Sequence, residues 1–365
     1  MISSIKLKNF KCFKNERIPL SPLTVLSGVN SMGKSTVLQA LRMLRQSVIS
    51  NTIKNEGALL NGTLVSLGTA DDVLYEKADN DDSIGVGLTV TDGNEEYFFE
   101  FNYSTGERIL PNAPHSPKTC EMLLMDNFFY LQAERLGPRV SFPCSNYEVQ
   151  HYNRIGNAGE FCAHLLSKYE RSNICSENML HESQPENSLR LQVEAWMSEI
   201  GHNLRIHLND YPKMDMTNME FSFLHEDIPS NNYRASNVGF GLTYSLPIFV
   251  SCLLCKPRGL ILIENPEAHL HPRAQVAMGK FLAGCAANNI QIILETHSDH
   301  VLNGIRIAVK NARINPSDVA LHFFHRSDNS MNAHIISPEI DSDGRLDQWP
   351  EGFFDSWETG LAELL

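Results

Sequence analysis

The stretch GVNSMGKS, residues 28–35, has the spacing G-x-x-x-x-G-K-S of a Walker A loop. An apolar run at residues 23–26 precedes it, and a segment with helical spacing of apolar residues begins at Thr36. This order of strand, glycine-rich loop and helix is the setting in which the motif binds phosphate. Backbone N–H groups of the loop and the dipole of the following helix both attract an anion.

The side chains of this loop predict ATP and Mg²⁺ as ligands. Lys34 has the length to reach the β- and γ-phosphates, and the hydroxyl of Ser35 is suited to hold Mg²⁺. We therefore expect a catalytic contribution from Lys34 and a metal contact from Ser35. The residues expected to contact the nucleotide here are Gly28, Asn30, Ser31, Gly33, Lys34, Ser35 and Thr36.

The composition is that of a soluble globular protein, with 365 residues of which 42% are hydrophobic and 20% charged. The N-terminus runs directly into a charged strand pattern and shows no signal peptide. The longest apolar stretch, residues 242–255, is too short to cross a bilayer and contains Pro247, so we expect a buried helix and a cytoplasmic protein. Within it, Cys252 and Cys255 form a C-x-x-C pair without a second ligand pair nearby, which favours reduced thiols in the core over a zinc site.

The net charge of −13 argues against nucleic-acid binding over the whole surface. The charge is unevenly distributed, because residues 1–48 carry eight lysine or arginine residues and only one acidic residue, Glu16. Two interpretations remain open. The excess forms either a basic face that binds DNA or the solvated face of a strand, in which Lys6 and Lys8 alternate with Ile5 and Leu7.

Hydrophobic periodicity predicts further strands and helices. Residues 1–26 predict two or three strands, and residues 36–50 predict a helix with one apolar face. Residues 84–103 alternate and predict a hairpin around Asp92-Gly93-Asn94. The remaining assignments are a polar linker at 104–121, a strand at 128–131, a polar loop beside phosphate or on the surface at 132–139, and an amphipathic helix at 189–200.

Two apolar strands in the second half of the chain end in polar residues. GLILIE, residues 259–264, ends in Glu264 and has the Walker B form, in which the carboxylate helps to hold Mg²⁺. Residues 290–295 form another apolar strand, which Thr296, His297 and Ser298 follow. Because ligands of open α/β sheets lie at the carboxyl ends of the strands, we expect these side chains near the phosphates.

A third glycine-rich element, SNVGFG at residues 236–241, stands directly before the apolar helix. Glycines at a helix N-terminus expose backbone N–H groups to an anion. Since the Walker A loop already binds the nucleotide of this chain, the second anion site predicts contact with the γ-phosphate of ATP held by a second subunit. We expect Ser236, Asn237, Gly239 and Gly241 to form it.

The order of these parts resembles the ABC-type ATPases of the SMC/RecF/OLD branch. The matching motifs are LKNFKCF at residues 7–13, the Walker A loop, the glycine-rich signature, the Walker B strand with ENPEAHLHP at 264–272, and ETHS at 295–298. The tail WPEGFFD, residues 349–355, resembles that of short bacterial AAA-family ATPases. Such relatives are often encoded beside nucleases or other effectors in phage-defence loci.

The resemblance implies an α/β fold, an ABC-type (SMC/RecF-like) P-loop ATPase head with a mixed central sheet flanked by helices and an N-terminal antiparallel β subdomain. It implies a single ATPase domain over residues 1–365. Within this domain we expect a β-rich insert at 51–121, a helical lobe at 157–235, and the signature, Walker B strand, switch histidine and tail at 236–365.

The resemblance also implies roles for single residues. His297 is the expected switch histidine that contacts the γ-phosphate, and Gln132 is the candidate Q-loop residue. His271 lies near the D-loop position. For His269 and His271 together, a structural or D-loop role is favoured over metal binding.

The sequence departs from the family pattern after the Walker B strand, where relatives have Asp-Glu and this chain has Glu264 and Asn265. Asparagine cannot accept a proton, so we hypothesise that Glu267 polarises the attacking water and that turnover is slow. Alternatively, Glu267 only caps a helix or pairs with an arginine.

A second departure concerns accessory domains. The chain ends soon after the ATPase core, whereas an OLD nuclease would continue into a Toprim domain. Asp341, Asp343 and Asp347 are interpreted as solvated loop acids rather than as nuclease metal ligands. The sequence shows no heptad pattern long enough for a coiled-coil arm.

These features predict an ATP-hydrolysing head that forms ATP-dependent dimers or higher oligomers. It would gate a partner effector, such as a nuclease encoded nearby, in bacterial anti-phage defence. Two alternatives remain open: a DNA-repair or DNA-end-binding ATPase that acts through the N-terminal basic face, and a slowly hydrolysing scaffold that ATP stabilises. No membrane partner is expected.

Overall fold

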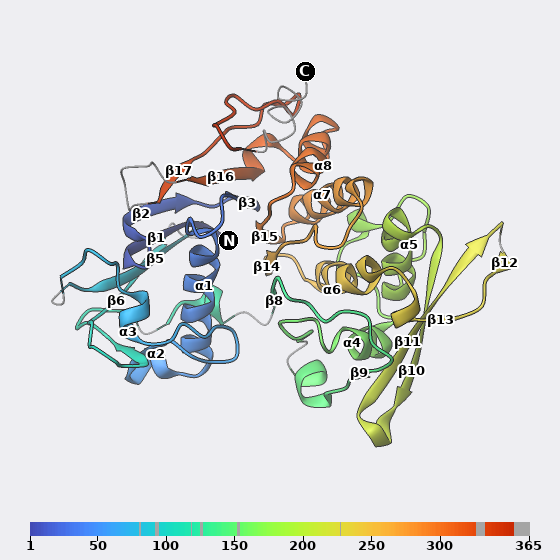
Figure 1. Cartoon of the computed structure of the whole chain (residues 1–365), viewed down its shortest axis with the longest axis horizontal. Coiled ribbons are helices and arrows are strands. Elements are labelled where there is room, and N and C mark those ends of the chain that lie inside the picture. Colours follow the sequence, from blue (N-terminus) through green and yellow to red (C-terminus); the bar gives the residue numbers. More distant parts are fainter. Residues whose placement is uncertain are drawn as a thin grey trace. The chain divides into compact units, whose positions relative to one another are not determined.

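The computed structural model describes the chain except residues 80–81, 92–94, 118, 125–126, 152–153, 227, 326–332 and 354–365. The chain divides into two units, where the sequence predicted a single domain (Figure 1). Unit 1 comprises Met1–Met125, Val319–Glu339 and Leu346–Leu365, and unit 2 comprises Asp126–Asp318 and Ile340–Arg345. Each unit is described by itself.

Unit 1 begins with the antiparallel sheet that the sequence predicts. Its strands, in spatial order, are β2 (Phe13–Pro19), β1 (Ile2–Phe10), β5 (Ile84–Val90) and β6 (Glu95–Phe101). Alternate residues such as Ile5 and Leu7 are fully buried, so the period-two pattern correctly assigns one face to the core. The hairpin β5–β6 is confirmed, while its expected turn residues 92–94 lie outside the described residues.

The Walker A segment of unit 1 is a strand, a loop and a helix. Strand β3 (Leu23–Gly28) pairs in parallel with β16 (Val319–His325), which pairs antiparallel with β17 (His334–Ile336). Helix α1 (Lys34–Ile49) follows the loop, close to the predicted 36–50. These elements and the N-terminal sheet confirm an α/β class with a mixed sheet and an antiparallel β subdomain.

The remaining elements of unit 1 lie in the expected β-rich insert. They are α2 (Thr52–Asn55), β4 (Gly57–Leu59), α3 (Ala70–Val73), β7 (Ile109–Pro111) and a 3₁₀ turn at Glu121–Leu123. Strand β7 pairs antiparallel with β4, so the segment expected as a polar linker is partly tied back into the unit.

The tail of unit 1 packs through one aromatic residue. The ring of Phe353 is 1% exposed and lies 5.3 Å from the ring of Phe323 on β16. Trp349 contacts Phe353 from a position that is 51% exposed. The last two residues of the motif WPEGFFD, Phe354 and Asp355, lie outside the described residues.

Unit 2 contains three parallel strands in the order β15 (Gln291–Glu295), β14 (Leu260–Glu264) and β8 (Phe128–Leu131). Their near-continuous apolar sequences are typical of parallel strands that are covered on both faces. Because the strands are parallel, their carboxyl ends lie at the same edge of the sheet.

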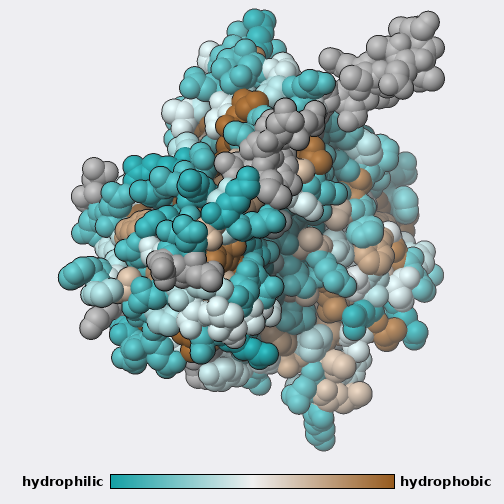
Figure 2. Space-filling model, turned by 60° about the vertical axis from the view of Figure 1, so that its left-hand side comes forward, coloured by the Kyte–Doolittle hydropathy of each residue, from teal (hydrophilic) through white to brown (hydrophobic). Residues whose placement is uncertain are grey.

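The helices of unit 2 are α4 (Cys162–Tyr169), α5 (Leu189–Gly201), α6 (Phe240–Leu254), α7 (Pro272–Ala287) and α8 (Asp299–Lys310), of which α7 and α8 lie side by side (Figure 1). Helix α6 is buried from Leu242 to Leu253, which confirms a core helix. Among the described residues, no helix combines the length and apolar character that a membrane span requires. On the face drawn in Figure 2, hydrophilic residues predominate and hydrophobic ones lie in separate patches.

The stretch 157–235, expected as a helical lobe, also contains a long antiparallel hairpin. Strand β10 (Leu204–Tyr211) pairs with β11 (Met216–His225) over eight residue pairs. Short strands join it at β9 (Phe142–Pro143), β12 (Ile228–Pro229) and β13 (Tyr233–Arg234). Single turns of 3₁₀ or π helix complete unit 2 at Tyr147–His151, Glu177–Met179, Pro212–Met214, Ala235–Asn237 and Pro316–Asp318.

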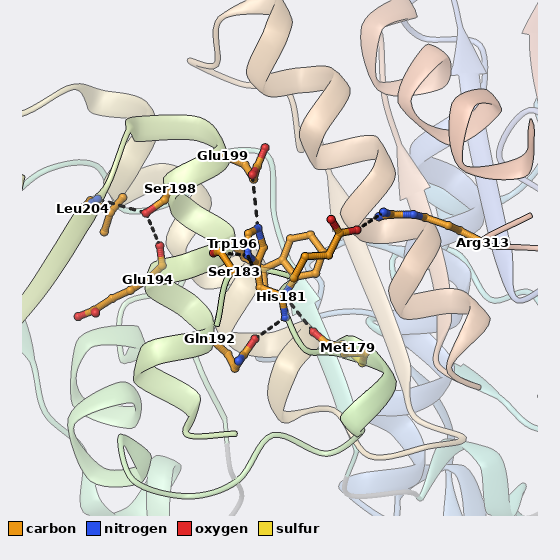
Figure 3. Close-up of polar contacts among 11 residues, drawn as sticks. Met179, His181, Ser183, Gln192, Glu194, Trp196, Ser198, Glu199, Leu204 and Arg313 are labelled. Atoms are coloured by element: carbon orange, nitrogen blue, oxygen red, sulfur yellow. Dashed lines mark hydrogen bonds and ion pairs between the residues drawn. The ribbon is translucent and has the colours of Figure 1, made fainter. Parts of the chain in front are cut away.

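The segment before α5 is held against that helix by side-chain hydrogen bonds (Figure 3). The indole N–H of Trp196 donates to Met179 O at 3.0 Å, and the backbone N–H of His181 donates to Gln192 Oε1 at 2.8 Å. The His181 ring packs edge-on to Trp196. Its Nδ1 lies 2.8 Å from Ser183 Oγ. These bonds replace the strand or helix partners that an irregular segment lacks.

His322 makes the stability of unit 1 depend on pH. Its ring is 1% exposed, Nε2 donates to Pro19 O at 2.7 Å, and Nδ1 lies 2.8 Å from Ser337 Oγ. Burial lowers the pKa of His322. Below about pH 6.5 the unfolded chain therefore binds a proton that the folded chain resists, and stability falls as pH falls.

We expect the free energy of unfolding of the wild type to decrease between pH 7.5 and 5.5, by at most about 1.4 kcal/mol per pH unit from this group. The variant His322→Gln should lose that part of the slope. Urea unfolding at both pH values measures it, and equal slopes in the two proteins would contradict the assignment.

Candidate functional site

The Walker A loop of unit 1 turns through three residues with positive φ, which are Gly28 at 131°, Ser31 at 64° and Gly33 at 99°. A Cβ atom at Gly28 would lie 2.1 Å from the carbonyl oxygen of Phe324 on β16. At Gly33 it would lie 2.6 Å from Cys12 Sγ. Both glycines of the motif are therefore required by the backbone conformation and by the space around them.

Lys34 is held beneath this loop. It is the first residue of α1 and is 3% exposed, and its Nζ donates to Gly28 O at 2.9 Å and to Val29 O at 2.7 Å. The ammonium group is thus fixed at the place where the motif binds phosphate. Of the other predicted contacts, Asn30 and Ser31 are exposed, Ser35 is half-buried and Thr36 is buried.

A pocket of about 270 Å³ adjoins the loop in unit 1, since Cys12, which lies against Gly33, is one of its lining residues. Its lining is formed by Lys11, Cys12, Asp72, Leu74, Tyr75, Glu76 and Lys77. Sequence reasoning did not find the segment 72–77. The sequence pointed to this pocket only through the LKNFKCF motif, because its residues Lys11 and Cys12 line the pocket together with residues 72–77.

Unit 2 orients the Walker B acid at the carboxyl end of β14. Oε1 of Glu264 accepts a hydrogen bond from the Tyr130 hydroxyl at 3.0 Å, and Oε2 accepts from the backbone N–H of Ala133 at 3.1 Å. Both donors belong to β8 or to the loop that follows it. The neighbouring parallel strand therefore sets the direction of this carboxylate.

The oxygen donors of Ser35 and Glu264 fit Mg²⁺, which prefers hard oxygen ligands. In the described part of the chain, no group of three or more His, Cys, Asp or Glu residues could hold a metal ion. A magnesium ion would therefore need further oxygens from phosphate and water, which is the ordinary mode of Mg²⁺ binding in nucleotide sites.

The carboxylate of Glu267 binds the segment after β15. Oε2 accepts from the Thr296 hydroxyl at 2.7 Å, and Oε1 accepts from the backbone N–H of His297 at 2.8 Å. The His297 side chain is exposed, while Thr296 is fully buried. Glu267 thus positions the predicted switch histidine, which neither interpretation from the sequence foresaw.

The two signature glycines lie in different surroundings at the start of α6. Gly239 is exposed, and a Cβ atom there would meet nothing within 4 Å. A Cβ atom at Gly241 would lie 2.6 Å from the carbonyl oxygen of His269. Ser236 and Asn237 are exposed beside them, in a single 3₁₀ turn.

The two histidines after the Walker B strand have structural contacts. The His269 ring packs against Phe240 at 4.3 Å and Tyr244 at 4.8 Å between ring centroids. His271 is the N-cap of α7, where Nδ1 accepts from the backbone N–H of Arg273 at 3.3 Å. These contacts favour the structural interpretation over metal binding.

Gln132 and Arg135 follow β8 in the loop that the sequence places either beside phosphate or on the surface. The Gln132 side chain donates to Glu134 O at 2.8 Å within its own loop. Arg135 is 3% exposed, and its guanidinium donates to backbone carbonyls rather than facing solvent. Sequence reasoning missed this burial, because arginine is rarely fully buried.

Three of the N-terminal basic residues, Lys6, Lys8 and Arg17, have partners on the surface of their own sheet. Nζ of Lys8 lies 2.9 Å from Glu100 Oε1, and Arg17 pairs with Glu96. Nζ of Lys6 lies 5.4 Å from the Phe98 ring. These pairs favour the interpretation of a solvated strand face over a basic face that binds DNA.

The C-x-x-C pair and the loop acids near residue 341 lie in different environments. Cys252 and Cys255 are fully buried in the core, and burial raises the pKa of the Cys255 thiol well above its ordinary value. Asp341, Asp343 and Asp347 are exposed, with Asp341 Oδ1 accepting from the backbone N–H groups of Asp343 and Arg345.

Three family models match parts of the chain. Residues 1–110 match "AAA ATPase domain", residues 127–303 match "AAA domain, putative AbiEii toxin, Type IV TA system", and residues 314–364 match "Protein of unknown function (DUF3696)". The OLD nuclease of Thermus scotoductus is 24% identical over 324 residues, which cover 82% of this chain. The chain spans 59% of the length of that relative. These matches support an ATPase domain of the AAA type.

Solved structures with a similar arrangement include SMC head domains. The SMC head domain from Thermotoga maritima is 14% identical with a TM-score of 0.45, covering 93% of this chain and 99% of that one. The Smc head domain bound to the C-terminal domain of ScpA, from Pyrococcus furiosus, is 13% identical with a TM-score of 0.46, covering 100% and 99%.

The surroundings of the two signature glycines predict a large effect of an alanine substitution at Gly241 and a small one at Gly239. Gly241→Ala places a methyl group against His269 O and should lower the free energy of unfolding by about 1–3 kcal/mol. Gly239→Ala, at a φ of −55° and in open space, should change it by less than about 0.5 kcal/mol. Urea unfolding of both variants tests this, and equal effects would contradict the geometry.

Proposed function

We propose that this chain is an ATPase head that binds ATP with Mg²⁺, pairs with a second copy around the nucleotide, and gates a partner effector. The observation that carries the proposal is the Walker A loop. Its two glycines fit only as glycines, and the ammonium of Lys34 is held by the loop carbonyls. The two ATPase-domain models that match the chain support the same activity.

Unit 1 binds the nucleotide. The phosphates lie on the loop and the N-terminus of α1, with Lys34 supplying positive charge. The nucleoside lies in the adjoining pocket, which Leu74 and Tyr75 help to line. Ser35 of unit 1 supplies a protein oxygen for Mg²⁺, which would stabilise negative charge on the phosphates when it is bound. Glu264 of unit 2 is a further oxygen donor of the kind that Mg²⁺ prefers.

Unit 2 supplies the hydrolytic groups. Glu267 polarises the attacking water, and His297 contacts the γ-phosphate. The hydrogen bonds from Thr296 and His297 N to Glu267 support this pairing, because they hold the acid and the histidine segment together. Slow turnover is expected, because Asn265 stands at the position where relatives have the glutamate that accepts a proton.

The second copy contacts the start of α6. Gly239 has open space around it, so nothing within the chain requires a glycine there. A phosphate approaching the uncapped N–H groups of a fifteen-residue helix does require one. This supports a γ-phosphate from a partner subunit as the ligand of Ser236, Asn237, Gly239 and Gly241.

The effector is a nuclease or toxin-like protein that acts in anti-phage defence. The support is the name of the matched relative, an OLD nuclease, and of the matched model, which refers to a toxin of a Type IV TA system. Direct action on DNA has less support, because the N-terminal basic residues are paired with Glu96, Glu100 and Phe98.

Removal of the Lys34 ammonium should abolish most of the ATP affinity. Lys34→Ala loses one or more charge-assisted hydrogen bonds to phosphate, worth about 1.5–3 kcal/mol each, so the Kd should rise about tenfold to 100-fold. Equilibrium titration with a fluorescent ATP analogue measures it. Lys54→Ala, an exposed lysine of unit 1, is the matched control and should bind normally. Equal affinity of the two variants would overturn nucleotide binding at this loop.

Glu267→Gln should keep ATP affinity and lose turnover, because the amide cannot take a proton but can still accept from His297 N. We expect the phosphate-release rate to fall at least tenfold, while light scattering shows ATP-dependent dimers that persist longer than those of the wild type. A full rate in the variant would exclude Glu267 as the group that polarises water. An unchanged mass with ATP would exclude the sandwich dimer.

A further inference from the structure

Arg135 is buried in unit 2 and donates to four backbone carbonyls. Nε donates to Tyr244 O at 3.0 Å, Nη1 to Gln132 O at 3.1 Å and to Glu264 O at 2.6 Å, and Nη2 to Asn265 O at 2.7 Å. The side chain is 3% exposed. One guanidinium therefore joins three segments: the loop after β8, the end of β14 and the first turns of α6.

Tyr244 completes the connection from the side of α6. Its hydroxyl donates to Ala133 O at 2.6 Å and accepts from the backbone N–H of Arg135 at 2.9 Å. The guanidinium carbon lies 4.6 Å from the centre of the Tyr244 ring, in stacking range. The Tyr244 ring also contacts His269, which packs beside the signature residue Phe240.

The connection reaches Glu264 by two routes, one to its backbone carbonyl and one to its side-chain carboxylate. Arg135 binds the backbone carbonyl of Glu264 itself, and Ala133, whose carbonyl Tyr244 binds, donates its N–H to Glu264 Oε2 at 3.1 Å. A shift of α6 therefore acts on both the main chain and the side chain of Glu264. Close packing of the interior makes such a shift hard to absorb locally.

The surroundings of Arg135 indicate a role beyond stability. The guanidinium is buried, and its direct partners are backbone carbonyls. A buried charge without a directly bonded carboxylate is an expensive way to stabilise a fold, because an apolar core of the same volume is often equally stable.

We propose that Arg135 is a positioning residue that couples the N-terminus of the signature helix α6 to the Walker B acid Glu264, so that contact at α6 sets the metal-binding geometry of the same chain. The inference rests on the proposed ATPase function. It adds a path by which a ligand or second copy at Ser236–Gly241 changes the turnover of its neighbour.

Position 135 requires a side chain that can donate to four backbone carbonyls at once, and the planar guanidinium of arginine does so. Its nitrogen donors point in fixed directions within one plane and reach four carbonyls at once. A lysine keeps the charge but presents one nitrogen, which cannot reach carbonyls on three separate segments. Arg135→Lys therefore separates the charge from the geometry.

The test compares Arg135→Lys and Tyr244→Phe with the wild type. We expect unchanged ATP affinity within about twofold, since the Walker A loop of unit 1 is not altered, and at least a tenfold lower kcat for Arg135→Lys. The Mg²⁺ concentration for half-maximal rate should rise in both variants, because the Glu264 carboxylate is less well oriented. A residue that only stabilised the fold would lower Tm and leave kcat and the Mg²⁺ dependence unchanged, and that result overturns the proposal.

Further measurements keep the test informative. Arg171→Lys, with a side chain that is 93% exposed, is the matched control and should behave as the wild type. If Arg135→Lys does not fold, Tyr244→Phe decides, because it removes one hydroxyl and keeps the ring. Amide exchange at Ala133 and Arg135 should accelerate in Tyr244→Phe even without ATP, and unchanged exchange overturns the proposal. A wild type without ATP turnover refutes the proposed function instead.

Discussion

Backbone groups at the carboxyl ends of the parallel strands lose their strand partners where the chain turns away, and charged side chains replace those partners. Lys34 donates to the carbonyls of Gly28 and Val29 after β3. Arg135 donates to the carbonyls of Glu264 and Asn265 at the end of β14. Buried or half-buried backbone groups that stay unpaired cost about as much as a lost hydrogen bond, so these contacts hold the strand ends in place.

The need to pair backbone groups at the strand ends also explains why charged side chains lie where phosphate chemistry is proposed. A charged side chain that binds backbone at a strand end is oriented by that backbone, and it cannot move freely with solvent. Glu267 follows this rule in unit 2, where its carboxylate fixes the N–H of His297. The alternatives of a catalytic and a structural Glu267 are therefore not exclusive, because the bond that anchors the acid also anchors the histidine.

Much of the fold could be predicted from local pattern. The glycine spacing of residues 28–35 and the alternation of residues 84–103 each reflect a short-range rule, and the structure confirms both elements. Strand β10 of the hairpin β10–β11 also has alternating apolar residues, at Leu204, Ile206 and Leu208. The polar residues around this short alternation made the strand hard to identify from the sequence. The stretch 157–235, expected as a helical lobe, therefore contains this hairpin besides α4 and α5.

The site was less predictable, because its contacts join residues far apart in the chain. Arg135 and Asn265 are separated by 130 positions, and nothing in the loop sequence indicates that an arginine there is buried. Glu267 and His297 are 30 positions apart. Motif spacing identifies the residues that are suited to bind phosphate. Only their contacts in the folded structure show which of these side chains bind backbone groups and which face outward.

The contrast between the two signature glycines carries the argument for a partner. Gly241 is explained within the chain, because His269 O leaves no room for a methyl group. Gly239 has no such neighbour within 4 Å, its φ of −55° suits any residue, and it is exposed at the first turn of a buried helix. The described part of the chain therefore gives no reason for a glycine at this position. Backbone N–H groups at a helix N-terminus favour an anion, which is why we propose the nucleotide of a second copy as the ligand there.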